Sequence, residues 1–351
     1  MASRSVGVDC RKVYQVGEKP LAIGRPGVLT FALRRGYDWP ALAAGAIMRN
    51  LIVAVLSLAA ASNAIAAEET TSAHLYQAVL QLGADVDLVR EVMGRPESTT
   101  DPWIVVQAEP RHVFYQALTL LRKANRLAAE LVNESRAGLL PVAEGEIQPP
   151  LVLDVIERAA AQIDAVRGEL GITYRAEMPE LDADREPADV LREIVQVSRQ
   201  LNHLIDRRFK PEDVYGRLEL AATYVAGALT RDEAVPEYGE LPPFESGKVP
   251  ADVYRRVLEC LELATVVGER RDVDVLKLNL RRELRRRDIA PADVYDLATT
   301  LLSEVAYLTL VLDAKDVDAP PIEQPKHIFP SHVYRIAGML QDELARLEAR
   351  N

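Results

Sequence analysis

The five residues Pro291-Ala292-Asp293-Val294-Tyr295 open a long segment of this 351-residue chain, and Pro250-Ala251-Asp252-Val253-Tyr254 repeats the same phrase. Further copies, in which Val or Leu and usually an aromatic residue follow, begin at Ser72, Pro110, Pro150, Pro187, Pro211 and Pro330. Each copy is followed by apolar residues at steps of three and four, which is the period of one buried helix face. The repeated phrase therefore predicts an all-α protein.

Each part of the phrase has a role at the start of a helix. Proline suits the first helical position, because its missing N–H has no partner there. The Asp two residues later lies in the first turn, where the helix dipole favours negative charge. Phe209, Ile289 and Ile328 precede their prolines by two residues and can pack on the Val of the phrase as hydrophobic staples. The phrase is thus interpreted first as a helix-start signal.

The spacing of the phrases predicts an internal duplication. Leu75, Val113, Leu153 and Val190 precede Val214, Val253, Val294 and Val333 by 139 to 143 residues. We therefore expect tandem duplication of a four-helix unit, residues 67–210 and 211–351, with eight main helices. Between the helices, linkers of roughly 15 to 20 residues contain proline and apolar residues and are long for a helical bundle. We expect ordered straps over a helical bundle or a solenoid-like array.

The segment before the first unit predicts export. Residues 48–66 combine a cationic start, an apolar stretch and the small-residue end Ala64-Ile65-Ala66, which is typical of a signal peptide. Residues 1–47 are then a non-native, disordered upstream extension. The alternative is that the apolar stretch is a retained membrane anchor. We expect a periplasmic or secreted protein, or one anchored at its N-terminus and facing the periplasm, with no integral membrane domain after signal cleavage.

Charge and motifs exclude several classes of chemistry. The net charge of −11 argues against nucleic-acid binding, since phosphate needs cations. Three of the five histidines, His74, His112 and His332, occupy the Asp position of the phrase and are interpreted as first-turn residues. Glu109 and His112 fit the ExxH spacing of di-iron bundles, but this motif occurs once. We expect no enzyme, no catalytic residue, no metal and no cofactor.

Two sets of residues are candidates for binding. The repeated aromatic residues could line a shared pocket near the helix N-termini, although core packing is the competing interpretation. These aromatics are Tyr76, Phe114, Tyr215, Tyr254, Tyr295 and Tyr334. Residues 268–290 first alternate like a strand and then resemble a basic helical turn. The arginines of that turn could dock an acidic partner or anionic headgroups, or could form a solvated face. They are Arg281, Arg282, Arg285, Arg286 and Arg287.

These observations favour an exported, non-catalytic helical module for protein interaction or scaffolding in the bacterial cell envelope. Its partner would be an unknown envelope protein. The alternative is a small-ligand protein that binds an anion or a metabolite near the helix N-termini, where helix dipoles attract negative charge.

Overall fold

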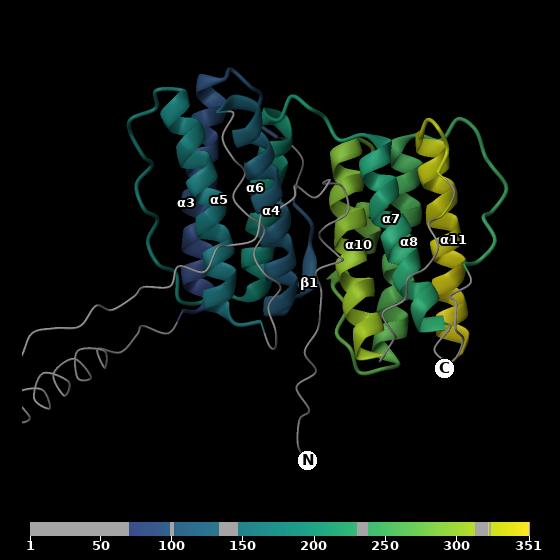
Figure 1. Ribbon diagram of the computed structural model, residues 1–351. Coiled ribbons are helices and arrows are strands. Elements are labelled where there is room, and N and C mark those ends of the chain that lie inside the picture. The colour runs from purple at the N-terminus through teal and green to yellow at the C-terminus, as the bar shows by residue number, and fades with distance from the viewer. Residues whose placement is uncertain are drawn as a thin grey trace, which may run out of the picture. The chain divides into compact units, whose positions relative to one another are not determined.

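The computed structural model describes residues 70–98, 102–132, 147–229, 238–312, 322 and 324–350, and the fold within these ranges is all-α (Figure 1). Its long helices are α3 (Ser72–Val92), α4 (Pro110–Leu131), α5 (Pro149–Glu169), α6 (Pro187–Leu204), α7 (Pro211–Leu229), α8 (Pro250–Glu269), α10 (Pro291–Val311) and α11 (Pro330–Ala349). The one-turn helix α9 (Leu280–Glu283) and the strands β1 (Val105–Gln107) and β2 (Lys277–Leu278) complete the described elements. The predicted all-α fold with eight main helices is confirmed.

The predicted upstream extension, the signal peptide and the apolar linker segment around residues 139–142 lie outside the described residues.

The helix starts follow the predicted phrase closely. Seven of the eight long helices begin with proline, and α3 begins with Ser72. In seven of the eight long helices, which are all except α5, the side chain at the third helical position accepts a hydrogen bond from the backbone N–H of the residue before the helix. The distances are 2.7 to 3.2 Å. The acceptors are His74, His112, Asp189, Asp213, Asp252, Asp293 and His332. Histidine and aspartate thus serve the same capping role.

One helix start needs a correction. Helix α5 begins at Pro149 rather than at Pro150, and the apolar residue of its phrase is Val152 rather than Leu153. Val152 is fully buried, whereas Leu153 is half-buried at the edge of the core. The pair of adjacent prolines made both registers possible in the sequence, and burial selects the first.

The long helices pack as two four-helix bundles with the same pairing. In the first bundle, α3 and α4 each pack against both α5 and α6. In the second bundle, α7 and α8 each pack against both α10 and α11. The order of helices and their partners is therefore the same in both bundles, as tandem duplication predicts. The duplication itself stays a prediction.

The four helices of the second bundle start at the same end. The first turns of α7, α8, α10 and α11 surround one shallow, wholly apolar hollow of about 30 Å³. The hollow is lined by Pro211, Val214, Pro250, Val253, Pro291, Val294, Pro330 and Val333. Because neighbouring helices run in the same direction, the chain must travel back about 30 Å, the length of a 20-residue helix, before the next helix begins. Parallel packing thus explains the long linkers.

The described linkers lie over the helices as straps. In the first bundle, Gln77 and Gln81 of α3 donate side-chain hydrogen bonds to the carbonyls of Pro179 and Ala176 in the strap that leads to α6. As the chain advances from 176 to 179, it moves back toward the start of α3. Trp103, in the strap before α4, is 1% exposed. The prediction of buried apolar residues in the straps is borne out at Trp103 and Val105, whereas Tyr174, Met178 and Leu181 in the strap before α6 are exposed.

A short ladder joins a strap of each bundle. Strand β1, just before α4, pairs antiparallel with β2, and Val105 lies opposite Leu278. After β2 the chain forms the helical turn α9. This confirms the predicted strand-like segment followed by a basic helical turn in the linker before α10.

Helix α10 is buried over most of its length. Among the described helices, it alone has the length and apolarity that a membrane span requires, and 78% of its most apolar window is buried inside the fold. It packs against α7 and α8 within its own bundle, and it also contacts α4 of the first bundle. This second contact places polar residues of α10 in the interior.

Candidate functional site

A polar seam fills the contact between the two bundles. It consists of buried polar residues on the faces of α4, α6 and α10 that point away from their own bundle cores. The seam residues are Arg111, His112, Gln116 and Lys123 of α4, Ser198 and Arg199 of α6, and Asp293, Asp296, Thr300 and Glu304 of α10. Cations stand on α4 and α6 and carboxylates on α10. The charges are therefore complementary across the contact.

The centre of the seam is an ion pair with almost no access to solvent. Lys123 Nζ lies 2.7 Å from Asp296 Oδ1, and their side chains are 1% and 7% exposed. Lys123 also donates to the Ser198 carbonyl over 3.4 Å, and Asn202 Nδ2 lies 3.4 Å from Asp296 Oδ2. Burial raises the pKa of Asp296 above its usual value, although Lys123 acts in the opposite direction. Nearby, Gln116 donates to the Thr300 hydroxyl over 2.7 Å.

One end of the seam is organised around Glu304. Arg111 Nη1 lies 3.1 Å and His112 Nε2 lies 3.4 Å from Glu304 Oε2, which also accepts the Leu276 backbone N–H. His112 Nδ1 accepts the N–H of Glu109 at the helix start, so its proton is on Nε2, toward Glu304. Burial acts to raise the pKa of Glu304, but His112 and Arg111 outweigh it and the pKa is lowered.

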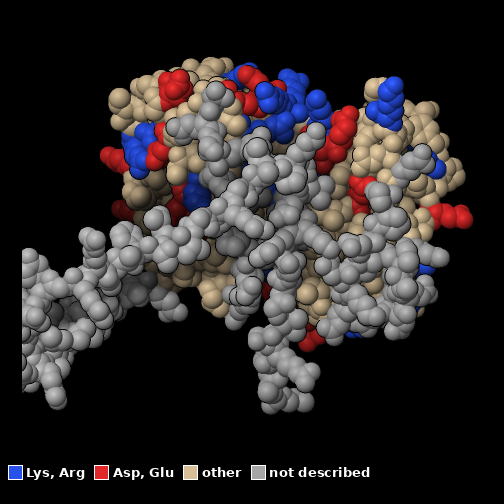
Figure 2. Space-filling view, in the orientation of Figure 1, with Lys and Arg blue, Asp and Glu red and all other residues tan. Residues whose placement is uncertain are grey.

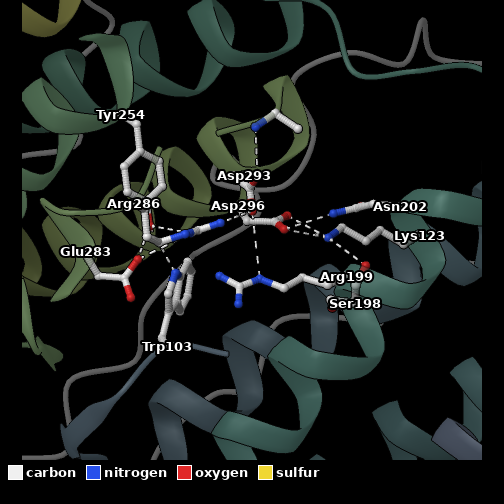
Figure 3. Close-up of polar contacts among 11 residues, drawn as sticks. Trp103, Lys123, Ser198, Arg199, Asn202, Tyr254, Glu283, Arg286, Asp293 and Asp296 are labelled. Atoms are coloured by element: carbon white, nitrogen blue, oxygen red, sulfur yellow. Dashed lines mark hydrogen bonds and ion pairs between the residues drawn. The ribbon is translucent and has the colours of Figure 1, made fainter. Parts of the chain in front are cut away.

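The other end of the seam joins the straps to the helix starts (Figure 3). Tyr254 donates to Glu283 Oε2 over 2.7 Å and accepts from Trp103 Nε1 over 3.2 Å. Arg286 connects Glu283, at 3.3 Å, with Asp293, at 3.1 Å. Burial and the neighbouring Glu283 raise the pKa of Tyr254, so its hydroxyl stays protonated and donates. Arg199 of α6 lies 3.8 Å from Asp293, so residues from both straps and both bundles meet in one network.

The polar residues of the seam form a structural interface between the two bundles. Its carboxylates are matched by cations and amides within hydrogen-bond or ion-pair distance, and the residues are buried. Among the described residues, no group of three or more His, Cys, Asp or Glu side chains is placed to hold a metal ion. Cys260 is buried, and burial raises the pKa of its thiol far above the usual range. Such a thiol has little thiolate for nucleophilic chemistry.

The candidate arginines separate into two groups. Arg286 belongs to the network with Glu283 and Asp293. Arg282 is half-buried, whereas Arg281, Arg285 and Arg287 are exposed on the turn before α10. Figure 2 shows a further gathering of basic side chains, beside acidic ones, around the connection from α6 to α7. The sequence analysis did not predict a basic cluster at that connection.

The candidate aromatics are placed in different surroundings. Phe114, Tyr215, Tyr254 and Tyr295 are buried, and Tyr76 and Tyr334 are half-buried. Tyr254 lies in the network described above, and Tyr295 stacks on Phe209 and accepts from Arg217. The hollow at the helix starts is lined by prolines and valines and by none of the six aromatics. Core and seam packing, the competing interpretation, thus describes the buried four.

The hollow is bordered by exposed apolar residues. Val249, which precedes α8, is 52% exposed, and Phe329, which precedes α11, is 59% exposed. The ring of Phe244 lies 4.9 Å from that of His332, and the ring of Phe329 lies 5.8 Å from it. We call the hollow with Val249, Phe329 and Phe244 the end face. It is a second candidate site, and the sequence analysis found only the prolines and valines at its centre.

The residues before the helices distinguish the end face from its counterpart in the first bundle. We match the helices in chain order, α3 with α7, α4 with α8, α5 with α10 and α6 with α11. Two residues correspond when they lie the same number of residues from the starts of matched helices. The residues before α3, α4, α5 and α6 are Thr71, Glu109, Gln148 and Glu186. The corresponding residues in the second bundle are Lys210, Val249, Ala290 and Phe329. Three polar residues are thus replaced by apolar ones.

Comparison with protein-family models, with curated proteins and with solved structures finds no match to this chain. The functional argument therefore depends on the geometry of the seam and the end face.

Proposed function

We propose that the chain is an exported, non-catalytic helical module that docks an apolar segment of a partner protein on the end face of the second bundle. The observation that carries the proposal is the pair of large apolar residues, Val249 and Phe329, exposed where the first bundle has Glu109 and Glu186.

Helix capping gives no reason for these residues. Side chains that accept a hydrogen bond are preferred before a helix, and replacing them with apolar ones costs about 0.5–2 kcal/mol. In neither bundle does the residue before a described long helix make a side-chain cap hydrogen bond, so the two bundles differ there in polarity and not in capping. A Val and a Phe exposed at these positions are better explained by contact with a partner, because exposed apolar clusters commonly mark interaction sites.

The hollow suits a side chain of a partner better than a free metabolite. Its volume of about 30 Å³ is well below the roughly 300 Å³ at which ligand pockets usually begin. A side chain that enters it would be surrounded by Phe244, Phe329 and Val249. The arrangement resembles a small anchor pocket within a wider apolar contact.

The seam supports the same proposal in another way. Its charged residues are engaged with one another in the interior, where they fix the two bundles together. Such a frame holds the helix starts that line the hollow in place, and a preorganised surface loses less entropy on binding.

The test is site-specific photo-crosslinking from position 244 in intact cells that produce the full chain. The matched variant is Val249→Glu with Phe329→Glu, which gives the second bundle the cap residues of the first. We expect a discrete adduct to a partner protein that disappears in the variant while its melting temperature is kept. An adduct that persists in the variant, or none at all, contradicts the proposal.

Two further results would support other assignments. Stabilisation of the purified chain by anions or metabolites in a thermal-shift screen would favour the small-ligand alternative. Residues 48–66 predict the export step, and N-terminal sequencing of the protein purified from cells should find a mature chain that begins at Ala67. An intact apolar segment in that protein would instead favour the membrane anchor.

A further inference from the structure

The strap of residues 238–248 runs along α11 in the opposite direction to the helix. The Gly239 N–H donates to Glu343 Oε1 over 2.8 Å near the end of α11. Arg335 donates to the Pro242 carbonyl over 2.6 Å, and the Lys248 N–H donates to the Ser331 hydroxyl over 3.1 Å at its start. Glu343 is therefore the first anchor of a strap that ends at the end face.

The carboxylate of Glu343 is buried without full compensation. The residue is 0% exposed, and its Oε2 has no hydrogen-bond partner. Burial raises its pKa to about 7, against the lowering effects of the Gly239 N–H and of Arg346. Asp342 on α11 acts to raise the pKa. From the strap, Tyr238 faces the same region, and beyond it partial burial also raises the pKa of Glu219 of α7.

The first bundle has the same anchor with a neutral side chain. Gln200 of α6 corresponds to Glu343, and its Oε1 accepts the Ser98 N–H over 3.0 Å in the strap that leads from α3 to α4. The geometry of the two anchors is thus alike, and the acceptor is an amide in one bundle and a carboxylic acid in the other.

We propose that the strap of residues 238–248 is a pH-sensitive clasp, seated on α11 when Glu343 is protonated and released when Glu343 ionises. Release hydrates the carboxylate and removes the cost of its burial. The strap carries Phe244 to the end face, so its release alters that surface. The clasp itself stands on the anchor geometry and does not depend on the proposed docking function.

The sign of the effect follows from the direction of the shift. A seated glutamic acid with a pKa of about 7 and a solvated one near its ordinary value of about 4.3 differ in proton affinity. Opening releases a proton, so it is favoured as the pH rises between these values. Between pH 5 and pH 8, the opening constant should rise on the order of 50-fold.

The experiment is amide hydrogen exchange on the full chain at pH 5, 6, 7 and 8, with observed rates divided by the intrinsic rates at each pH. The amide of Gly239 reports the clasp, and the amide of Ser98 is the internal control. Glu343→Gln reproduces the first bundle's anchor, and Gln200→Glu transfers the second bundle's anchor to the first.

We expect the protection of Gly239 to fall on the order of 50-fold from pH 5 to pH 8, while that of Ser98 stays level. Glu343→Gln should abolish the fall, and Gln200→Glu should produce one at Ser98. Level protection of Gly239 in the wild-type chain would overturn the proposal. A fall that persists in Glu343→Gln would overturn it as well, because Glu343 would not be the titrating group.

Discussion

The two bundles share a plan and differ in where they place charge. In α5 of the first bundle, Asp154 is half-exposed and pairs with Arg158 four residues later. The corresponding residue in α10 is Asp296, buried against Lys123 of the other bundle. The same residue type at the same helix position thus lies on a solvated surface in one bundle and in an interior contact in the other. The comparison shows that the outward faces, the strap anchors and the residues before the helices differ between the bundles, while the helices pair in the same pattern.

The largest expected difference between the bundles concerns these two aspartates. Asp296→Ala leaves Lys123 charged in the interior without its partner, which typically costs about 3–5 kcal/mol. Asp154→Ala removes an exposed pair and should change the free energy of unfolding by less than about 1 kcal/mol. Urea denaturation of both variants measures the difference. Equal effects would mean that the contact between the bundles does not exclude water.

The next largest difference in stability concerns the strap anchor Glu343, and it depends on pH. The folded-state pKa of Glu343 is raised, so protonation stabilises the fold at low pH and this contribution is lost as the pH rises toward 7. Relative to Glu343→Gln, the wild-type chain should lose about 2–3 kcal/mol between pH 5 and pH 8. The comparison needs unfolding curves of both chains at each pH. Parallel pH profiles would rule out the raised pKa.

A smaller change in the free energy of unfolding is expected from Tyr254, which corresponds to Phe114 of the first bundle. Tyr254→Phe makes the second bundle resemble the first, but it leaves Trp103 Nε1 without its acceptor and removes one donor from Glu283. The cost should be about 1–3 kcal/mol. Phe114 is buried in the same bundle position without such a network, so Phe114→Leu serves as a control for packing alone. If Tyr254→Phe left the free energy of unfolding unchanged, the seam network would add nothing to stability.

The smallest effect on stability belongs to the caps. Val249→Glu with Phe329→Glu should change the free energy of unfolding by no more than about 0.5 kcal/mol, because both side chains are exposed. The added carboxylates also lie near positive helix ends, which offsets the lost apolar contacts. Calorimetric melting of the variant tests this. A large loss of stability would show that Phe329 is a structural residue and would remove the argument for docking.

Much of this architecture could be predicted from the repeated phrase. Proline, the Asp or His at the third helical position and the apolar steps fixed the helix starts to within one residue, because each has a local physical cause. The one slip, at Pro149, came from two adjacent prolines that permit either register. The strand and the basic turn before α10 could also be predicted, because the apolar residues there first alternate like a strand and then follow a helical spacing.

The seam was not predicted, because polar residues on the outer face of an amphipathic helix are usually solvated. On α10, Asp293, Asp296, Thr300 and Glu304 stand at steps of three and four, as a solvent face would. Only their pairing with Lys123 and Arg111 of α4, which are far away in the sequence, makes them interior residues. The end face was missed for a similar reason, since a single Val or Phe before a proline carries no signal until four helix starts meet.

The shared direction of the helices is the claim on which the end face, the straps and the comparison of the bundles all depend. It can be measured by pulsed electron spin resonance between spin labels at positions 249 and 329, with labels at 109 and 186 as the same measurement in the first bundle. Both members of each pair precede helices that pack side by side. Parallel helices predict that each pair lies much closer than the length of a helix. A separation of about 30 Å or more, the length of a 20-residue helix, would mean that neighbouring helices run in opposite directions and would contradict the account.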